Sequence, residues 1–322
     1  MTYTPPKIFI AGHRGMVGSA LMRALRPTGA DIIAVPRHGL NLINTHDVFH
    51  FLDKHQPDQI YIAAAKVGGI IANSQQPADF LYQNLMIASN LIHAAAKLGI
   101  PRLLFLGSSC IYPKEAQTPI TEDALMAGPL EPTNEAYAIA KIAGIKLCAG
   151  YNAQYGTDFR AVMPCNLYGP NDFYHPDHSH VIPALLQKFH SATVTGAPSV
   201  QVWGTGLPRR EFLHVEDAAR GMITVMNSPK SQFETTTTPA RPFLNLGRGR
   251  DISIRDLALL IAKTVGFKGS IDFDPQKPDG TLRKCMSSRG IHMLGWAPQI
   301  SLAEGLRSTY HDFLHQHTET LH

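Results

Sequence analysis

The sequence Lys7-Ile-Phe-Ile-Ala-Gly-His-Arg-Gly-Met-Val-Gly18 joins a short apolar run to a turn that contains three glycines. The residues from Lys7 to Ala11 are typical of a β-strand, and the segment after the turn, to about Leu25, is amphipathic with helical spacing. Glycines let a backbone turn tightly and approach a pyrophosphate, whose charge a helix N-terminus stabilises. The stretch therefore indicates a dinucleotide site, although a plain tight turn could contain the same glycines.

Strand patterns and helical patterns alternate along the chain that follows. We expect strands at 31–35, 59–65, 102–107, 200–204 and 243–247, helices at 79–98, 135–155, 181–189 and 254–265, a turn at 164–170 and a loop at 227–239. Such alternation indicates an α/β fold with a parallel sheet. Ligands of these sheets bind beyond the carboxyl ends of the strands, which is where Gly68-Gly69 and Ser108-Ser-Cys110 are expected.

Arg37 follows the second expected strand, at a position where a dinucleotide site selective for NAD usually has a carboxylate. With Arg14 of the glycine turn, Arg37 could hold a 2′-phosphate, because a guanidinium group makes bidentate contacts with phosphate. The sequence therefore favours NADP over NAD. The alternative is a pair of solvated surface arginines.

The segment Pro132-Thr-Asn-Glu-Ala-Tyr-Ala-Ile-Ala-Lys141 is typical of a helix start, with Thr133 and Asn134 as candidate caps. Tyr137 and Lys141 are four residues apart, so their side chains share one face of the helix. A phenol works as an acid or base near neutral pH only if a nearby cation favours its anion, and Lys141 can be that cation. A half-buried tyrosine beside a solvent-reaching lysine is the alternative.

Composition excludes several classes of protein. The 322 residues are 44% apolar, enough for one large or two modest globular domains, and a formal charge of +4 without basic runs gives no indication of nucleic-acid binding. Four widely spaced cysteines favour a reduced cytoplasm over a disulfide framework or a thiolate metal site. We expect no signal peptide, no membrane span and, despite 16 histidines, no metal site.

The glycine turn, a serine after a mid-chain strand and the Tyr-x-x-x-Lys pair together resemble the extended short-chain dehydrogenase/reductases. More narrowly, motifs spread over nearly the whole chain resemble those of the GDP-L-fucose synthases. They are Ala11-Gly-His-Arg-Gly-Met-Val-Gly-Ser19, Ala63-Ala-Ala-Lys-Val-Gly-Gly69, Leu106-Gly-Ser-Ser-Cys-Ile-Tyr-Pro113, the segment 131–144, Asn166-Leu-Tyr-Gly-Pro170, Ser179-His-Val-Ile-Pro-Ala-Leu185 and Lys277-Pro-Asp-Gly-Thr281. Residues 208–217 also resemble the Arg-Glu-Phe-x-x-Val-x-Asp signature of the extended family.

The resemblance implies an α/β fold with a Rossmann-type doubly wound parallel sheet and a smaller, discontinuous α/β substrate domain. The NADP-binding domain would comprise residues 1–170 and about 208–248, and the nucleotide-sugar domain about 171–207 and 249–322. The implied substrate is GDP-4-keto-6-deoxy-D-mannose. The implied reaction inverts carbons 3 and 5 and then reduces the carbon 4 ketone with NADPH. The implied protein is usually a homodimer, and we expect it in the cytoplasm.

Site residues follow from the same resemblance. Ser108, Tyr137 and Lys141 would be the reductase triad, with Cys110 as the base and His180 as the acid of epimerisation. The positions implied for NADP are Gly12, His13, Arg14, Gly15, Met16, Val17, Gly18, Arg37, Asn41, Leu42, Leu106, Gly107, Ser108, Ser109, Tyr137, Lys141, Pro164, Cys165, Asn166, Leu167 and His180. Those implied for the substrate are Lys188, Trp203, Arg210 and Asp279. Without the resemblance, Cys110 would be an inert buried thiol, His180 a loop or helix-start histidine and Trp203 a packing residue.

Three positions depart from the family pattern. Asn44 and Ser287 stand where relatives have aspartate, and Lys188 stands where they tend to have arginine, whose bidentate fork lysine lacks. Two other functions are open. Another epimerase or 4-keto reductase of the same fold would not need both Cys110 and His180, and an NADP-sensing scaffold could lose Tyr137 or Lys141.

Overall fold

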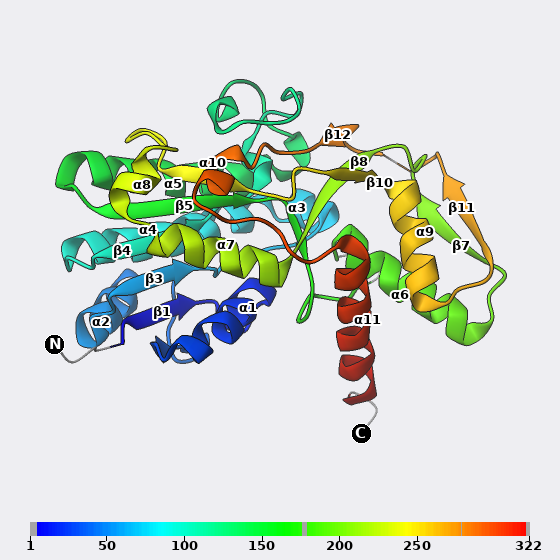
Figure 1. Ribbon diagram of the computed structural model, residues 1–322, viewed down its shortest axis with the longest axis horizontal. Coiled ribbons are helices and arrows are strands. Elements are labelled where there is room, and N and C mark those ends of the chain that lie inside the picture. Colours follow the sequence, from blue (N-terminus) through cyan, green and yellow to red (C-terminus); the bar gives the residue numbers. More distant parts are fainter. Residues whose placement is uncertain (1–4, 176–178, 278, 320–322) are drawn as a thin grey trace.

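The computed structural model describes residues 5–175, 179–277 and 279–319, and its larger part is built on a parallel sheet (Figure 1). Six strands pair in the order β2-β1-β3-β4-β5-β9, and every pair is parallel. They are β1 (Lys7–Ala11), β2 (Asp31–Ile33), β3 (Gln59–Ile62), β4 (Arg102–Leu106), β5 (Asp158–Pro164) and β9 (Phe243–Leu246). The strands are mostly apolar on both faces, as a sheet covered on both sides requires.

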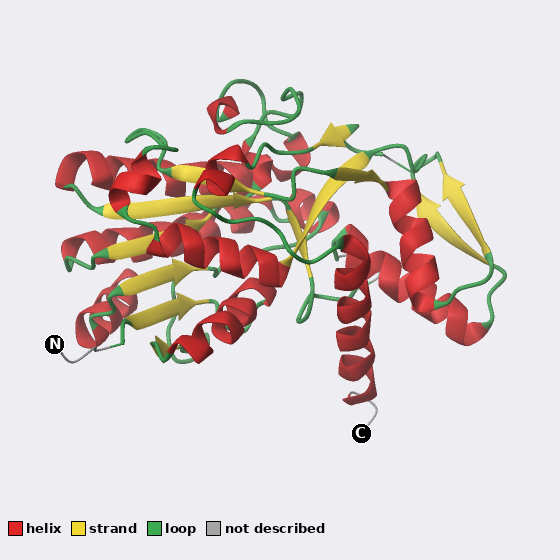
Figure 2. Ribbon diagram, viewed as in Figure 1, coloured by secondary structure: helices red, strands yellow, loops and turns green. Residues whose placement is uncertain are grey.

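Helices cover both faces of this sheet, as Figure 2 shows. One face carries α1 (Met16–Leu25) against α7 (Val215–Asn227), and the other carries α2 (Thr45–His55), α4 (Pro77–Lys97) and α5 (Glu135–Tyr155). The chain leaves β1 for β2 on one side and returns to β3 on the other, so the strand order reverses between β1 and β3. In a doubly wound sheet such a reversal is where a nucleotide binds.

A second, smaller part of the molecule has its own apolar core (Figure 1). One sheet of this part has β8 (Arg209–His214) between β10 (Asp251–Ser253) and β12 (Arg283–Lys284), with β6 (Asn166–Tyr168) also paired to β8. The other sheet pairs β7 (Ser199–Trp203) with β11 (Ser270–Asp274). The helices here are α6 (Val181–Thr195), α9 (Ile254–Val265) and α11 (Leu302–Glu319). The proposed domain boundaries stay a prediction.

Most expected elements are present, and two expectations are wrong. The helix expected at 254–265 has those bounds, and the helix expected at 181–189 continues to Thr195. The region 164–170 is more than a turn, because β6 forms there and pairs with β8. The region 227–239 contains the short helix α8 (Lys230–Glu234), which begins after a proline and buries Phe233.

Candidate active site

The glycine turn lies at the carboxyl end of β1, beside the end of β3. Gly12 has φ +88°, and a Cβ placed on it would lie 2.6 Å from the backbone N of Ala64, so only glycine fits between the two strand ends. Gly18 packs α1 against the turn in the same way, because a Cβ there would collide with the backbone of Gly12. Gly15, the N-cap of α1, has open space at its Cβ position apart from Gly12 O at 3.5 Å. The turn is therefore closed on the protein side and open where α1 begins.

Two observations indicate that this turn fits an anionic ligand. The first turn of α1 has no acidic residue, and its cap provides no side-chain hydrogen bond. In addition, Nδ1 of His13 is buried and has no hydrogen-bond partner within the described part of the chain. Burial, and then the charge of Arg14, lowers the pKa of His13. The helix N-terminus and the buried nitrogen are groups that a pyrophosphate could satisfy.

The two arginines expected at the 2′-phosphate are exposed at the ends of neighbouring strands. Arg14 follows β1 and Arg37 follows β2, and neither makes an ion pair with any residue that the structure describes. The adjacent loop is held by Asn90 of α4, whose side chain donates to the carbonyl groups of Leu42 and Ile43. This loop is therefore fixed in place.

Asn41 and Asn44 have local roles in that loop. Asn41 Oδ1 accepts a hydrogen bond from the N–H of Ile43. Asn44 Oδ1 accepts from the N–H groups of His46 and Asp47, which makes Asn44 the N-cap of α2. An asparagine is as good a cap as the aspartate of the family pattern, so this departure preserves the helix start.

Lys141 is buried against the end of β4. Its Nζ donates to the carbonyl oxygen of Leu106 at 2.7 Å and lies 5.5 Å from the centre of the Tyr137 ring. The close contact depends on Gly144, where a Cβ would be 2.5 Å from the Phe105 ring. The helix start differs from expectation: Thr133 and Asn134 lie in a 3₁₀ turn, and the Asn134 side chain caps no backbone N–H. The expected Tyr137–Lys141 face is present.

Burial shifts the pKa values of this pair in opposite directions. It lowers the pKa of Lys141 to about 8, with the nearby Cys110 opposing the shift. It raises the pKa of Tyr137, and Cys110 raises it further. The structure shows no lowering of the Tyr137 pKa by Lys141, because burial and then Cys110 both raise it. The phenol is protonated at neutral pH and can act as a proton donor.

Ser108 and Cys110 lie in the turn directly after β4. The Ser108 hydroxyl accepts a hydrogen bond from the N–H of Cys110 at 3.4 Å and caps the 3₁₀ turn Ser109–Ile111. Cys110 is 7% exposed, and burial raises the pKa of its thiol, with the Ser108 hydroxyl and the charges of Lys284 and Lys141 opposing this shift. The structure thus brings Ser108, Cys110, Tyr137 and Lys141 together.

Lys284 is a further cation whose charge acts on Cys110, and the sequence analysis did not single it out. It was visible only as the last residue of Lys277-Pro-Asp-Gly-Thr-Leu-Arg-Lys284. Strand pairing places it beside Arg210 of β8, and its charge reaches Cys110. No local pattern indicates this, because it depends on a contact between distant segments.

His180 is the N-cap of α6, and its side chain makes no cap hydrogen bond. The residue retains exposed surface, yet the protein around the imidazole desolvates it and lowers the pKa of His180. Within the described ranges, no hydrogen bond joins His180 to Cys110 or Tyr137. Its role as the acid of epimerisation stays a prediction.

The expected cofactor positions after β5 lie at the junction of the two parts. Cys165 donates its N–H to the carbonyl of Leu246, and Asn166 donates its side-chain amide to the carbonyl of Glu211. Burial raises the pKa of the Cys165 thiol well above its usual value, with Glu211 adding to the shift. Cys165 is therefore a neutral packing residue.

The four residues expected on the nucleotide end of the substrate come together in the smaller part. The Nζ atoms of Lys188 and Lys277 lie 5.2 Å and 5.4 Å from the Trp203 ring centre. Asp279 accepts hydrogen bonds from the N–H and the hydroxyl of Thr205, both at 2.7 Å. Burial lowers the pKa of Arg210, and the Asp279 carboxylate partly opposes this shift. Lys277 and Thr205 are members of this group that the sequence analysis missed.

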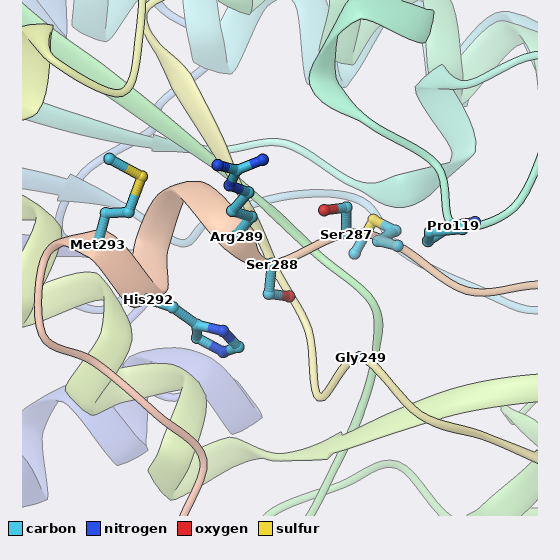
Figure 3. A pocket seen from close by; sticks show the side chains of 8 residues that line it. Pro119, Gly249, Ser287, Ser288, Arg289, His292 and Met293 are labelled. Atoms are coloured by element: carbon cyan, nitrogen blue, oxygen red, sulfur yellow. The ribbon is translucent and has the colours of Figure 1, made fainter.

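Ser287, another departure from the family pattern, lines a different hollow. This cavity of about 480 Å³ lies between α10 (Arg289–Met293), the loop at Pro119 and the turn at Gly249 (Figure 3). None of the expected catalytic side chains is among its lining residues. The Ser287 substitution therefore lies outside the cluster around Tyr137.

Three further observations concern the described residues as a whole. Among residues 5–175, 179–277 and 279–319, no three histidine, cysteine or acidic side chains are grouped closely enough to hold a metal ion. In the same ranges, no helix has both the length and the apolar character that crossing a bilayer requires. All four cysteines are free and buried.

Comparison with known proteins identifies the class of this fold and site. The model of the NAD dependent epimerase/dehydratase family matches residues 8–237. GDP-L-fucose synthase of Escherichia coli (strain K12) is 56% identical over 309 residues, which cover 96% of each chain. GDP-L-fucose synthase 1 of Arabidopsis thaliana is 50% identical, covering 96% of this chain and 93% of that one. The chain belongs to the NAD dependent epimerase/dehydratase family and, within it, to the GDP-L-fucose synthases.

A solved structure extends the comparison to the cofactor. The GDP-mannoheptose C4 reductase MlghC from Campylobacter jejuni, with NADP bound, is 35% identical, with a TM-score of 0.86. The alignment covers 98% of this chain and 100% of that one. The likeness therefore includes both parts of the molecule.

Proposed function

We propose that this enzyme converts GDP-4-keto-6-deoxy-D-mannose to GDP-L-fucose, by inverting carbons 3 and 5 and reducing the carbon 4 ketone with NADPH. The observation that carries the proposal is the cluster of Ser108, Cys110, Tyr137 and Lys141 after β4. It lies at the same edge of the parallel sheet as the glycine turn. The identity to bacterial and plant GDP-L-fucose synthases supports the choice of substrate.

NADPH supplies the hydride for carbon 4 when it is bound. The open start of α1 and the buried Nδ1 of His13 fit its pyrophosphate, and Arg14 and Arg37 fit its 2′-phosphate. The expected positions in the turn, in the 41–42 loop and after β4 and β5 complete this proposed site. Lys141 would bind the nicotinamide ribose and Tyr137 would donate its proton to the carbon 4 oxygen.

The residues after β4 can also carry out epimerisation. Both inverted carbons are α to the ketone, so each can lose a proton once the enolate oxygen is stabilised, here by Tyr137 and Ser108. The Cys110 thiolate would take that proton: an S–H bond forms, the C–H bond breaks and its electron pair moves onto the oxygen. Protonated His180 would return a proton to the opposite face of the carbon.

The smaller part would bind the guanosine diphosphate. Trp203 is 44% exposed, and its ring can stack on a base, while the lysines beside it and Arg210 can neutralise a diphosphate. Asp279, fixed by Thr205, would bind the nucleoside end. The proposed substrate domain comprises about 171–207 and 249–322; most residues of the separate apolar core lie in those ranges, and Tyr168 and Phe212 of that core lie outside them.

A cytoplasmic homodimer is part of the proposal. Tyr82 on α4 and Ile139 and Tyr155 on α5 are exposed apolar side chains on two helices that pack together, which supports an interface there. Four free, buried cysteines support a reducing compartment. Light scattering of the purified enzyme tests the oligomeric state.

The test of function is an isotope-exchange assay. The enzyme is given GDP-4-keto-6-deoxy-D-mannose and NADPH in D₂O, and NADPH consumption and deuterium at carbons 3 and 5 are measured. We expect both. Consumption of NADPH without exchange would instead indicate a simple 4-keto reductase. The absence of both NADPH consumption and exchange would contradict the proposal.

The variant Cys110→Ser separates the two half-reactions. We expect exchange at carbons 3 and 5 to fall by at least about 100-fold, because a hydroxyl is a far weaker base than a thiolate. NADPH affinity should be unchanged. Cys148→Ala, which alters a buried cysteine on α5, is the control and should retain exchange. Unchanged exchange in Cys110→Ser would remove the thiol from the mechanism.

A further inference from the structure

The turn that carries Cys110 is followed by a buried tyrosine that joins it to β9. Tyr112 ends the 3₁₀ turn Ser109–Ile111, and its N–H donates to the carbonyl of Ser109. The tyrosine is almost fully buried, and its hydroxyl donates to Oδ1 of Asn245 in β9 at 2.5 Å. One residue therefore binds the catalytic turn with its backbone and the sheet with its side chain.

Asn245 is the centre of a buried hydrogen-bond network at the edge of the large sheet. Its side chain has no exposed surface, although β9 is the last strand on that side. Besides accepting from Tyr112, it donates its side-chain amide to the carbonyl of Ile120 at 3.0 Å. Its backbone N–H donates to the buried carboxylate of Glu122 at 2.9 Å. Asn245 thus holds both the beginning and the end of the loop 112–122.

The end of this loop is also bound to the segment 285–288. The N–H of Ile120 donates to the carbonyl of Cys285 at 2.9 Å, and its carbonyl accepts from the N–H of Ser287 at 2.8 Å. The Ser288 hydroxyl both accepts from the N–H of Gly247 and donates to its carbonyl, each at 3.0 Å, directly after β9. The loop end, β9 and the segment 285–288 therefore form one fixed frame, and the Tyr112 hydroxyl joins the catalytic turn to it.

We propose that Tyr112 and Asn245 are positioning residues for epimerisation, whose hydrogen bond holds the turn that carries Cys110 against α5. This inference rests on the proposed function. A base must lie within hydrogen-bond reach of the proton that it removes, and a misplacement of about 1 Å can cost about 100-fold in rate. The glycine turn and the Trp203 group bind elsewhere, so affinity for NADPH and for the nucleotide should not depend on this bond.

The test measures deuterium exchange at carbons 3 and 5 with NADP⁺ bound, so that no reduction follows, and divides the rate by the number of sites that bind NADPH. In Tyr112→Phe, which removes only the hydroxyl, we expect kcat for exchange to fall by about 5- to 20-fold, with KM changed by less than about threefold. In Asn245→Leu we expect a fall of about 100-fold. The double variant should be within about threefold of Asn245→Leu, because both substitutions remove the same bond.

The matched control is Asn152→Leu, at the opposite end of β5. Three side-chain hydrogen bonds join Asn152 to Thr157 and Phe159, so its loss should lower stability but leave exchange per site unchanged. An equal fall in this control would indicate a merely structural effect and overturn the inference. So would an unchanged kcat in Tyr112→Phe, which decides the question alone if Asn245→Leu does not fold, or a double variant in which the two losses multiply. A wild-type enzyme without exchange would instead contradict the proposed function itself.

Discussion

Arg37 is an exposed residue whose proposed role is to bind a ligand. It makes no ion pair with any residue in the described ranges, although acidic side chains are common on the surface. An unpaired guanidinium at the end of β2 adds little to stability but presents a rigid donor fork to solvent. This is the residue for which the choice between NADPH and NADH should be most visible.

Replacing Arg37 by alanine should weaken NADPH binding by about 10- to 100-fold, the amount that charged hydrogen bonds contribute. NADH, which lacks the 2′-phosphate, should bind almost as before. Titration of each cofactor against the protein's intrinsic fluorescence gives both constants. Arg26→Ala, an exposed arginine after α1, is the control. Equal losses for the two cofactors would contradict the 2′-phosphate assignment.

Helix α5 sets the position of the catalytic pair through one close contact with β4. Gly144 allows the helix to lie against Phe105, one turn after Lys141. Gly150, farther along the same helix, has nothing within 4 Å of its Cβ position. Both glycines lie in the same helix, so comparing substitutions at the two positions separates the effect of packing from that of helix propensity.

Gly144→Ala should destabilise the protein by about 1–3 kcal/mol, because the added methyl group overpacks the contact with Phe105. Gly150→Ala should instead stabilise it by about 0.5–1 kcal/mol, through the better helix propensity of alanine. Urea unfolding of both variants measures the two free energies. Similar values of the same sign would show that the α5–β4 contact adjusts freely and does not fix Tyr137 and Lys141.

Sequence patterns predicted the elements that show a local periodicity of apolar residues. The helix 254–265 follows from its period, and in the structure Ser253 caps it by accepting a hydrogen bond from the N–H of Asp256. Strand β6 was not predicted, because its three residues form a strand only through pairing with β8. Lys284 was missed for the same reason. The Tyr137–Lys141 face was predicted, but the direction of the pKa shift of Tyr137 depends on burial, which a local pattern does not contain.

The stability of the whole molecule should depend on pH through Lys141. Its pKa is 10.5 before folding and about 8 in the folded protein. Below about pH 8 the lysine is charged in both states, so the folded state bears the full cost of burying an ammonium group. As the pH rises from about 8 to about 10.5 the folded state loses its proton first and this cost disappears.

Lys141→Met should therefore gain stability relative to the wild type at neutral pH, and this gain should decline by about 3 kcal/mol between pH 8 and 10.5. Urea unfolding of both proteins across that range measures the difference, in which shifts of other groups cancel. Lys146→Met, an exposed lysine on the same helix, should show a difference that does not vary with pH. A constant difference for Lys141→Met would mean that the lysine is hydrated in the folded protein.

The chain crosses between the two apolar cores, and this limits where the protein can be truncated. Strand β9 completes one edge of the large sheet, but it is synthesised only after β6, α6, β7 and β8 have entered the smaller part. A polypeptide that stops near residue 170 would leave the backbone groups of β5 unsatisfied, and such an open edge recruits other chains. A product whose large sheet is complete therefore requires translation through β9, and truncations that end near residue 170 should form inclusion bodies instead of an isolated cofactor module.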